Sequence, residues 1–231
     1  MRIVRITGVA LAALLFYCLT LSNAVAKDEA WKLSAAVKAV KEIAATPKSG
    51  IPPAIIRNAH AVAIFPGAMK TDFMVSGKQA EGMLLVQDNE GKWSAPAFVS
   101  LSGGTLGWQV VAGPMDIILV FKNSKSIDSI LKGKFIMDAR QTVLIGPVGQ
   151  SLKAATKEEQ AADILTYTRA GSSFADVVVA GATVQVNAAA NAGYYAVPKI
   201  RAEDILAGAA GKASEEIVSL QKSLSEYVSR K

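Results

Sequence analysis

The chain has 231 residues, of which 51% are hydrophobic and 19% charged, so it can bury a sizeable core and is not an intrinsically disordered tail. Its formal net charge of +6 favours acidic partners, either membrane phosphates or nucleic acid. The one cysteine, Cys18, lies in the leader described next, which leaves the rest of the chain without a disulfide, a thiol nucleophile or a thiolate metal site.

Residues 1–26 have the three parts of a secretory signal peptide. Arg2 and Arg5 supply its positive start, an apolar run covers residues 9–21, and Ala24-Val25-Ala26 fits the small-residue cleavage rule. A membrane-spanning helix needs about 20 apolar residues, which makes an uncleaved anchor the less favoured alternative. The bulky residues before Cys18 disfavour a lipoprotein. We therefore expect an exported chain in the periplasm, where it could lie peripherally on an envelope membrane.

The first expected element of the mature chain is a helix over residues 28–46. Leu33, Val37, Val40, Ile43 and Ala44 recur at helical spacing and form one apolar stripe. Prolines and a glycine then interrupt the chain, and a short helix is expected over residues 53–58, with proline in its first turn.

From residue 61 to about residue 149, short apolar runs alternate with turn signals, which predicts a series of strands. Most of these runs are continuously apolar, so we expect both faces of the sheet to be covered. Asp88-Asn89-Glu90-Gly91 predicts a hairpin turn, and a helix is expected over residues 124–131. The expected strands cover residues 61–65, 83–86, 97–101, 108–112, 117–121 and 142–145.

The last part of the chain predicts helices and one more stretch of strand. A short helix is expected over residues 157–165 and strands over residues 175–186, whereas residues 187–195 are ambiguous. Residues 214–230 form an amphipathic helix in which Glu226 and Arg230 can pair.

The sequence thus predicts an α+β fold, with a mostly antiparallel, largely buried sheet between flanking N- and C-terminal amphipathic helices. After a cleaved signal peptide at 1–26, we expect a single domain over 27–231. Its core is about 51–196, preceded by the N-terminal helix at 28–46 and followed by a C-terminal helical extension at 202–230.

Catalytic signals are scarce. His60 is the only histidine, and it stands beside an apolar strand start without an evident partner, which favours a structural role. The chain has no nucleophile elbow, phosphate loop or dinucleotide-binding glycine motif, and the glycines at 103–107 are interpreted as a strand connection. Carboxylates such as Glu81 and Asp116 could pair in space, and the alternative is that they are solvated loop charges. We expect no enzyme, no cofactor and no metal.

Several motifs occur in a characteristic order. Ile51-Pro52-Pro53 precedes Ala61-Val62-Ala63-Ile64, and Gly91-Lys92-Trp93-Ser94-Ala95-Pro96 forms the most specific box. Later matches are Gly103-Gly104 with Gly107, the run 116–120, Leu131-Lys132-Gly133, Gly146-Pro147-Val148-Gly149, Tyr167-Thr168-Arg169, Asn191 and Tyr194-Tyr195. Over roughly residues 33–195 the chain resembles the SYLF domain family. It departs from the family pattern at Ala80, Asp176 and Ala180.

The resemblance implies binding of acidic phospholipids, which are phosphoinositides in eukaryotic members, and an association with actin in the yeast branch. It also implies that a helix before the core contributes to membrane binding. In a periplasm, the corresponding ligands would be phosphatidylglycerol, cardiolipin or lipid A phosphates.

The first helix partly fits that role. Lys32 and Lys41 flank the apolar stripe, while Lys38 and Trp31 lie on the opposite side, where tryptophan could anchor at an interface. The alternative is that the stripe packs on the sheet and the lysines face water. The complete set of lipid-binding candidates is Trp31, Lys32, Lys38, Lys41, Lys48, Arg57, Lys70 and Lys78.

The sequence therefore favours an exported, non-catalytic lipid-binding module, whose partner is an anionic phospholipid or membrane surface. The alternative is an envelope protein-interaction or scaffold module with a protein partner, and an unrecognised enzyme ranks third. Nucleic acid is disfavoured, because export separates the chain from the genome and its charge is modest.

Overall fold

The computed structural model describes residues 28–45, 51–68, 79–103, 115–138, 142–144, 161–170, 173–174, 181–211 and 214–230. Within this part, nine strands form one sheet in the order β5-β9-β3-β2-β1-β4-β7-β6, with β8 beside β7. Every pair is antiparallel except β6 with β7. The α+β class and the mostly antiparallel sheet predicted from the sequence are confirmed.

The strands are β1 (Ala61–Phe65), β2 (Ala80–Val86), β3 (Ala97–Gly103), β4 (Met115–Phe121), β5 (Phe135–Ile136), β6 (Thr142–Leu144), β7 (Ile164–Ala170), β8 (Ser173–Phe174) and β9 (Ala182–Val186). A helix over residues 28–44, here called the N-terminal helix, precedes them. The other helices are α2 (Pro53–Arg57), α4 (Lys125–Leu131), α6 (Ala188–Tyr195), α7 (Ala202–Leu206) and α8 (Glu215–Val228).

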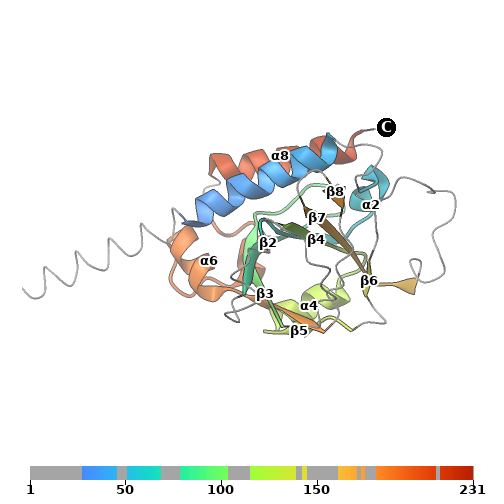
Figure 1. Ribbon diagram of the computed structural model, residues 1–231. Coiled ribbons are helices and arrows are strands. Elements are labelled where there is room, and N and C mark those ends of the chain that lie inside the picture. The colour runs from blue at the N-terminus through green and yellow to red at the C-terminus, as the bar shows by residue number, and fades with distance from the viewer. Residues whose placement is uncertain are drawn as a thin grey trace, which may run out of the picture.

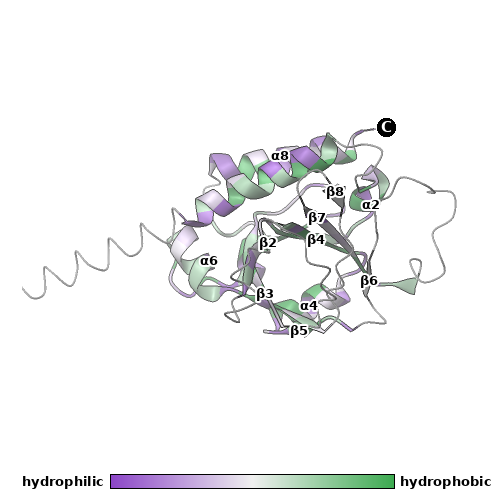
Figure 2. Ribbon diagram, in the orientation of Figure 1, coloured by the Kyte–Doolittle hydropathy of each residue, from purple (hydrophilic) through white to green (hydrophobic). Residues whose placement is uncertain are grey.

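Helices cover both faces of the central strands, as their continuous apolar runs predict. All five residues of β1 are buried, and they alternate between two hydrophobic clusters. Val62 and Ile64 pack with the N-terminal helix and α8, whereas Ala61, Ala63 and Phe65 face the cluster that contains α4. The N-terminal helix and α8 lie side by side over the sheet (Figure 1), and both contain hydrophilic as well as hydrophobic residues (Figure 2).

The hairpin between β2 and β3 forms at the expected turn. Gln87 and Trp93 make a bridge across it, and the amide of Gly91 donates to the carbonyl of Asp88 at 3.1 Å. Gly91 has a φ of 81°, which glycine adopts without a steric penalty. The Asp88 carboxylate accepts hydrogen bonds from the amides of Glu90 and Lys92, so the side chain fixes the turn.

The helix expected over residues 157–165 is wrong at its end, because Ile164 begins β7. β7 pairs with β4 over seven residues, from Ile164 opposite Phe121 to Ala170 opposite Met115. This long-range pairing overrides the local pattern. The ambiguous segment after residue 186 is helix α6, whose first turn is capped by the Asn187 side chain. The strand expected over residues 108–112 lies outside the described residues.

Candidate functional site

The N-terminal helix turns its apolar stripe toward the sheet. Leu33, Val37, Val40, Ile43 and Ala44 are each at most 9% exposed and belong to the cluster that contains Val62 and Ile64. In this conformation the stripe therefore packs on the sheet, which was the alternative to membrane binding that the sequence left open. Burial there removes the stripe from water, so any membrane contact has to use the outer side of the helix.

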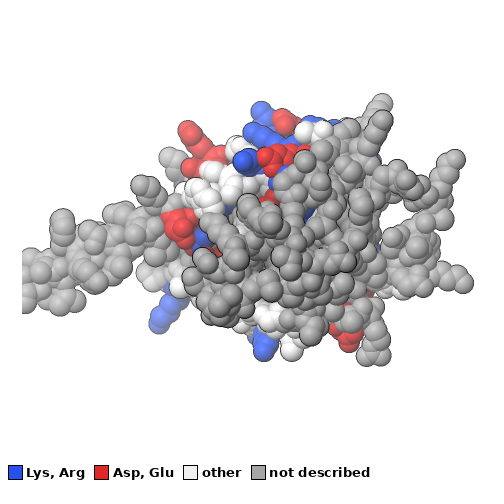
Figure 3. All heavy atoms as spheres, in the orientation of Figure 1, with Lys and Arg blue, Asp and Glu red and all other residues white. Residues whose placement is uncertain are grey.

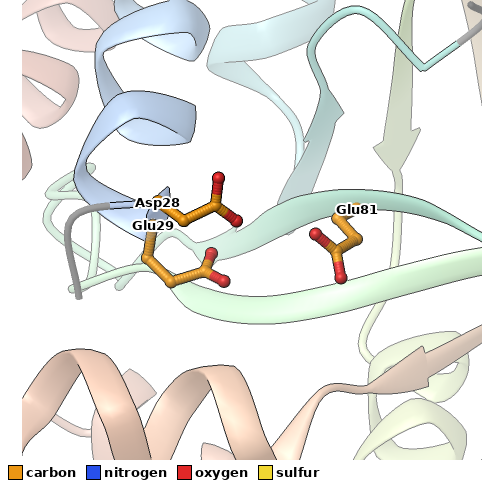
Figure 4. Close-up of side chains that lie close together, drawn as sticks. All are labelled: Asp28, Glu29 and Glu81. Carbon is orange, nitrogen blue, oxygen red and sulfur yellow. The ribbon is translucent and has the colours of Figure 1, made fainter. Parts of the chain in front are cut away.

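Lys32 is buried, and this corrects the expectation that it flanks the stripe at the surface. Its ammonium contacts Asp28 at 2.7 Å, Glu29 at 2.9 Å and the carboxylate of Glu81 on β2. In Figure 4 the three carboxylates converge from the helix start and the strand. Lys32 therefore fastens the first turn of the helix to the sheet, and its charge is neutralised by its neighbours.

The same cluster does not suit a metal ion. Oxygen atoms of Asp28, Glu29 and Glu81 lie within 4.8 Å of one another, which is close enough for a divalent cation. The Lys32 ammonium, however, contacts all three carboxylates. Burial alone would lower the pKa of Lys32, but its hydrogen bonds to Asp28, Glu81 and Glu29 raise it above its usual value. The resident cation is thus the lysine itself.

Glu29 gives this cluster a pH dependence. Burial raises the pKa of Glu29 above its ordinary value of 4.5, despite the opposing bond from Lys32. The native chain then binds a proton at Glu29 more tightly than the unfolded chain, so this group lowers the free energy of unfolding as pH rises through that window. The variant Glu29→Gln is expected to lose this decline, which urea denaturation between about pH 4.5 and neutrality measures.

The matched control is Glu226→Gln, which removes an exposed carboxylate from α8. It should leave the pH dependence of stability as in the wild-type protein. An unchanged decline in Glu29→Gln would show that Glu29 titrates as an ordinary carboxyl group.

A second ion cluster fastens the other end of the N-terminal helix. Arg169 of β7 is 8% exposed and forms ion pairs with Glu42 of the helix, at 2.6 Å, and with Asp116 of β4. Asp116 also accepts a hydrogen bond from the Gly67 amide at 2.9 Å. The helix is therefore held to the sheet by buried charges at both of its ends, which fixes how its outer side is presented.

The C-terminal ends of the N-terminal helix and α8 meet beside α2. The Arg230 guanidinium donates to the carbonyl of Ala44, rather than pairing with Glu226 as the sequence suggested. Arg57 donates to the carbonyl of Val228 at 3.0 Å and to that of Arg230 at 3.3 Å. These bonds bring cations from three separate segments together. We call this surface the basic end, formed by the exposed residues Lys38, Lys41, Arg57, Lys222 and Arg230.

Two carboxylates lie among these cations. Lys38 is 3.7 Å from Glu42 and Lys222 is 3.8 Å from Glu226. Such exposed, widely spaced pairs contribute little, and Glu42 is held more closely by Arg169. Figure 3 shows lysines and arginines over the two helices with acidic residues among them, and further acidic residues near the start of the N-terminal helix.

Among the remaining sequence candidates, the structure describes Trp31 alone. Trp31 is 58% exposed and lies on the outer side of the N-terminal helix, in line with Lys38 two turns later. Lys48, Lys70 and Lys78 lie outside the described residues. Sequence reasoning missed Lys222 and Arg230, because only the fold brings the last helix beside the first. His60 contributes to the sheet through its backbone. Its amide donates to the carbonyl of Phe121, and its carbonyl accepts from the amide of Gln87.

Known proteins resemble this chain over most of its length. The human and rat proteins named "SH3 domain-containing YSC84-like protein 1" are 27% and 26% identical over 185 residues, which cover 79% of this chain and 54% of theirs. The yeast "Protein YSC84" is 26% identical over 148 residues, which cover 63% of this chain and 31% of that protein. The chain thus spans about half the length of the animal relatives and about a third of the yeast protein.

Two further findings concern the class of protein to which the chain belongs. No helix within the described residues is both long and apolar enough to cross a membrane. The sequence profile of the Ysc84 family, described as "Las17-binding protein actin regulator", matches residues 102–227, which is more than half of the chain. Together with the resemblance to the SYLF domain, this match shows that the chain belongs to the Ysc84 family of SYLF-domain proteins.

Proposed function

We propose that this chain is a non-catalytic module that binds acidic phospholipid headgroups at a membrane surface through its basic end. The observation that carries the proposal is the convergence of exposed cations from three segments, namely Lys38 and Lys41, Arg57, and Arg230. Such a convergence suits a phosphate-rich surface, because neighbouring cations act on it together.

The geometry also suits phosphates in detail. Arg57 and Arg230 are oriented by backbone carbonyls of the helix ends, and each guanidinium has further N–H donors beyond those bonds. Each lysine near an anionic leaflet contributes roughly 1 kcal/mol. Trp31, on the same outer side as Lys38, is amphipathic and suits the headgroup region.

We further propose that the protein acts after export, with residues 1–26 removed, at the periplasmic side of an envelope membrane. Phosphatidylglycerol, cardiolipin and lipid A phosphates supply the required negative charge there. The intact mass of the protein recovered from the cell envelope tests the removal of these residues.

Sedimentation with vesicles tests the binding surface. The protein is expected to sediment with vesicles that contain phosphatidylglycerol, to remain in solution with pure phosphatidylcholine, and to dissociate as salt is added. The double variant Lys38→Glu/Lys41→Glu should bind at least about thirtyfold more weakly, since two favourable contacts become repulsive.

The matched control is Lys125→Glu/Lys132→Glu, which changes the net charge equally at α4, on the far side of the sheet from the two helices (Figure 1). It should bind nearly as well as the wild-type protein. Equal weakening by both double variants would mean that only net charge matters. Absence of vesicle binding, together with capture of one envelope protein, would favour the interaction module that the "Las17-binding" description of the family suggests.

A further inference from the structure

A cavity lies beneath the basic end, between the sheet and its helical cover. Its walls come from five elements, namely the N-terminal helix, α2, β1, β4 and α8, together with Ile51. Its interatomic space amounts to about 270 Å³, which includes open solvent, and the centre of a water-sized sphere can occupy only about 20 Å³ of it. The closed conformation therefore has room for the end of a chain rather than for a whole ligand.

The walls are apolar throughout in the described part of the chain, and consist of valine, isoleucine, leucine and tyrosine side chains. The Tyr227 hydroxyl donates to the carbonyl of Ile51, and burial raises the pKa of Tyr227 to about 12, so it stays neutral and its ring faces the cavity. Water would find no hydrogen-bond partner on such a surface. The chemistry of the cavity therefore selects hydrocarbon.

The cavity and the basic end are built from the same turns. Lys41 lies between the wall residues Val40 and Ile43, Arg57 directly follows the wall residue Ile56, and Arg230 comes three residues after the wall residue Tyr227. Cations thus lie on several sides of the apolar cavity. A ligand that matches both features has a negatively charged head and a hydrocarbon tail.

We propose that this cavity takes the end of the alkyl chain of a single anionic amphiphile, whose headgroup lies against Lys41, Arg57 and Arg230. The proposal rests on the proposed function for the headgroup, but it adds that the protein holds one lipid molecule individually. Vesicle binding through charge alone needs no such cavity, so the two claims can be tested separately.

Isothermal titration calorimetry with soluble lipids tests chain binding separately from charge-driven vesicle binding. The probe is myristoyl lysophosphatidylglycerol below its critical micelle concentration, compared with its chain-free headgroup, glycerophosphoglycerol, and with myristoyl lysophosphatidylcholine. The charged, chain-bearing lipid should bind at least about fourfold more tightly than the headgroup alone, because at least one methylene leaves water. Equal affinity of lipid and headgroup would overturn the proposal and leave the vesicle result standing.

A matched pair of strand variants locates the chain. Val62→Ile adds one methylene to the cavity wall, whereas Val120→Ile makes the same change at the residue opposite Val62 on β4, which does not line the cavity. Val62→Ile should keep or raise Tm and weaken lysophosphatidylglycerol binding about fourfold or more, since it takes the room of one methylene. Val120→Ile should leave the affinity unchanged. Equal effects of both variants would contradict binding in this cavity.

Photolabelling of the wild-type protein gives a test that does not depend on the stability of a variant. A lysophosphatidylglycerol with a diazirine at its chain end, irradiated with the wild-type protein, should label wall residues such as Val40, Ile56 and Leu224. Labelling restricted to the outer side of the N-terminal helix would overturn the proposal, since the chain would then lie on the surface.

Discussion

Replacing Gly82 by alanine is expected to lower the free energy of unfolding by about 3 kcal/mol, the upper range for overpacking in a core. A Cβ atom at this position would lie 2.3 Å from the carbonyl oxygen of Ile64 and 2.5 Å from the ring of Phe65. Both residues belong to β1, whose five residues are buried, so β1 and β2 would have to separate. Urea denaturation, or insolubility of the variant, measures the loss.

The control for Gly82→Ala is Gly67→Ala. Gly67 has a φ of 58° and nothing within 4 Å of the added atom, so alanine there should cost only the roughly 1 kcal/mol of a left-handed backbone. If both variants lost the same stability, the close approach between β1 and β2 would not be the reason for glycine at position 82.

Replacing Asn191 by aspartate is expected to lower stability by about 3 kcal/mol at neutral pH, because it buries a charge beside a carbonyl. Asn191 is fully buried in α6. Its side-chain oxygen accepts a hydrogen bond from the Phe98 amide at 2.8 Å, and its amide nitrogen donates to the Phe98 carbonyl at 3.1 Å. The side chain thus binds both backbone polar groups of Phe98 in β3, the strand that pairs with β9. Thermal or urea unfolding measures the loss.

The pH dependence of Asn191→Asp provides the sharper test. Protonation in acid restores a donor toward the Phe98 carbonyl, so this variant should recover stability as pH falls, relative to wild type. Asn191→Ala should also be destabilised, but without that recovery. A matched change at a half-exposed cap, Asn187→Ala, should cost only about 1 kcal/mol. Equal losses at Asn187 and Asn191 would contradict the bidentate role of Asn191.

Gly82 and Asn191 show how single residues join the elements of this fold. Gly82 permits the close contact of two central strands, and Asn191 fastens α6 to the sheet. In the Gly-x-Trp-Ser-x-Pro box, the Ser94 hydroxyl accepts from the Val86 amide, and the carbonyl of Pro96 accepts from the Tyr195 hydroxyl at 2.7 Å. The Trp93 carbonyl accepts from Gln221 of α8 at 2.9 Å. The box therefore joins the hairpin to the helical cover.

The sequence by itself determined the local elements. The positions of β1, the hairpin turn at Asp88 to Gly91, and the amphipathic N-terminal helix and α8 follow from apolar periodicity and turn chemistry, which act within a few residues. The burial of both faces of β1 follows from its unbroken apolar run. Resemblance to the SYLF domain supplied the family, which the sequence profile confirmed.

Only the tertiary structure decided which charges meet. Lys32 looked like a surface cation on a helical wheel, yet Glu81 from β2 helps to enclose it. Arg57 and Arg230 are 173 residues apart, and β7, whose first two residues were expected at the end of a helix, pairs with β4. Burial and ion pairing depend on neighbours contributed by distant segments, and periodicity along the chain carries no information about them.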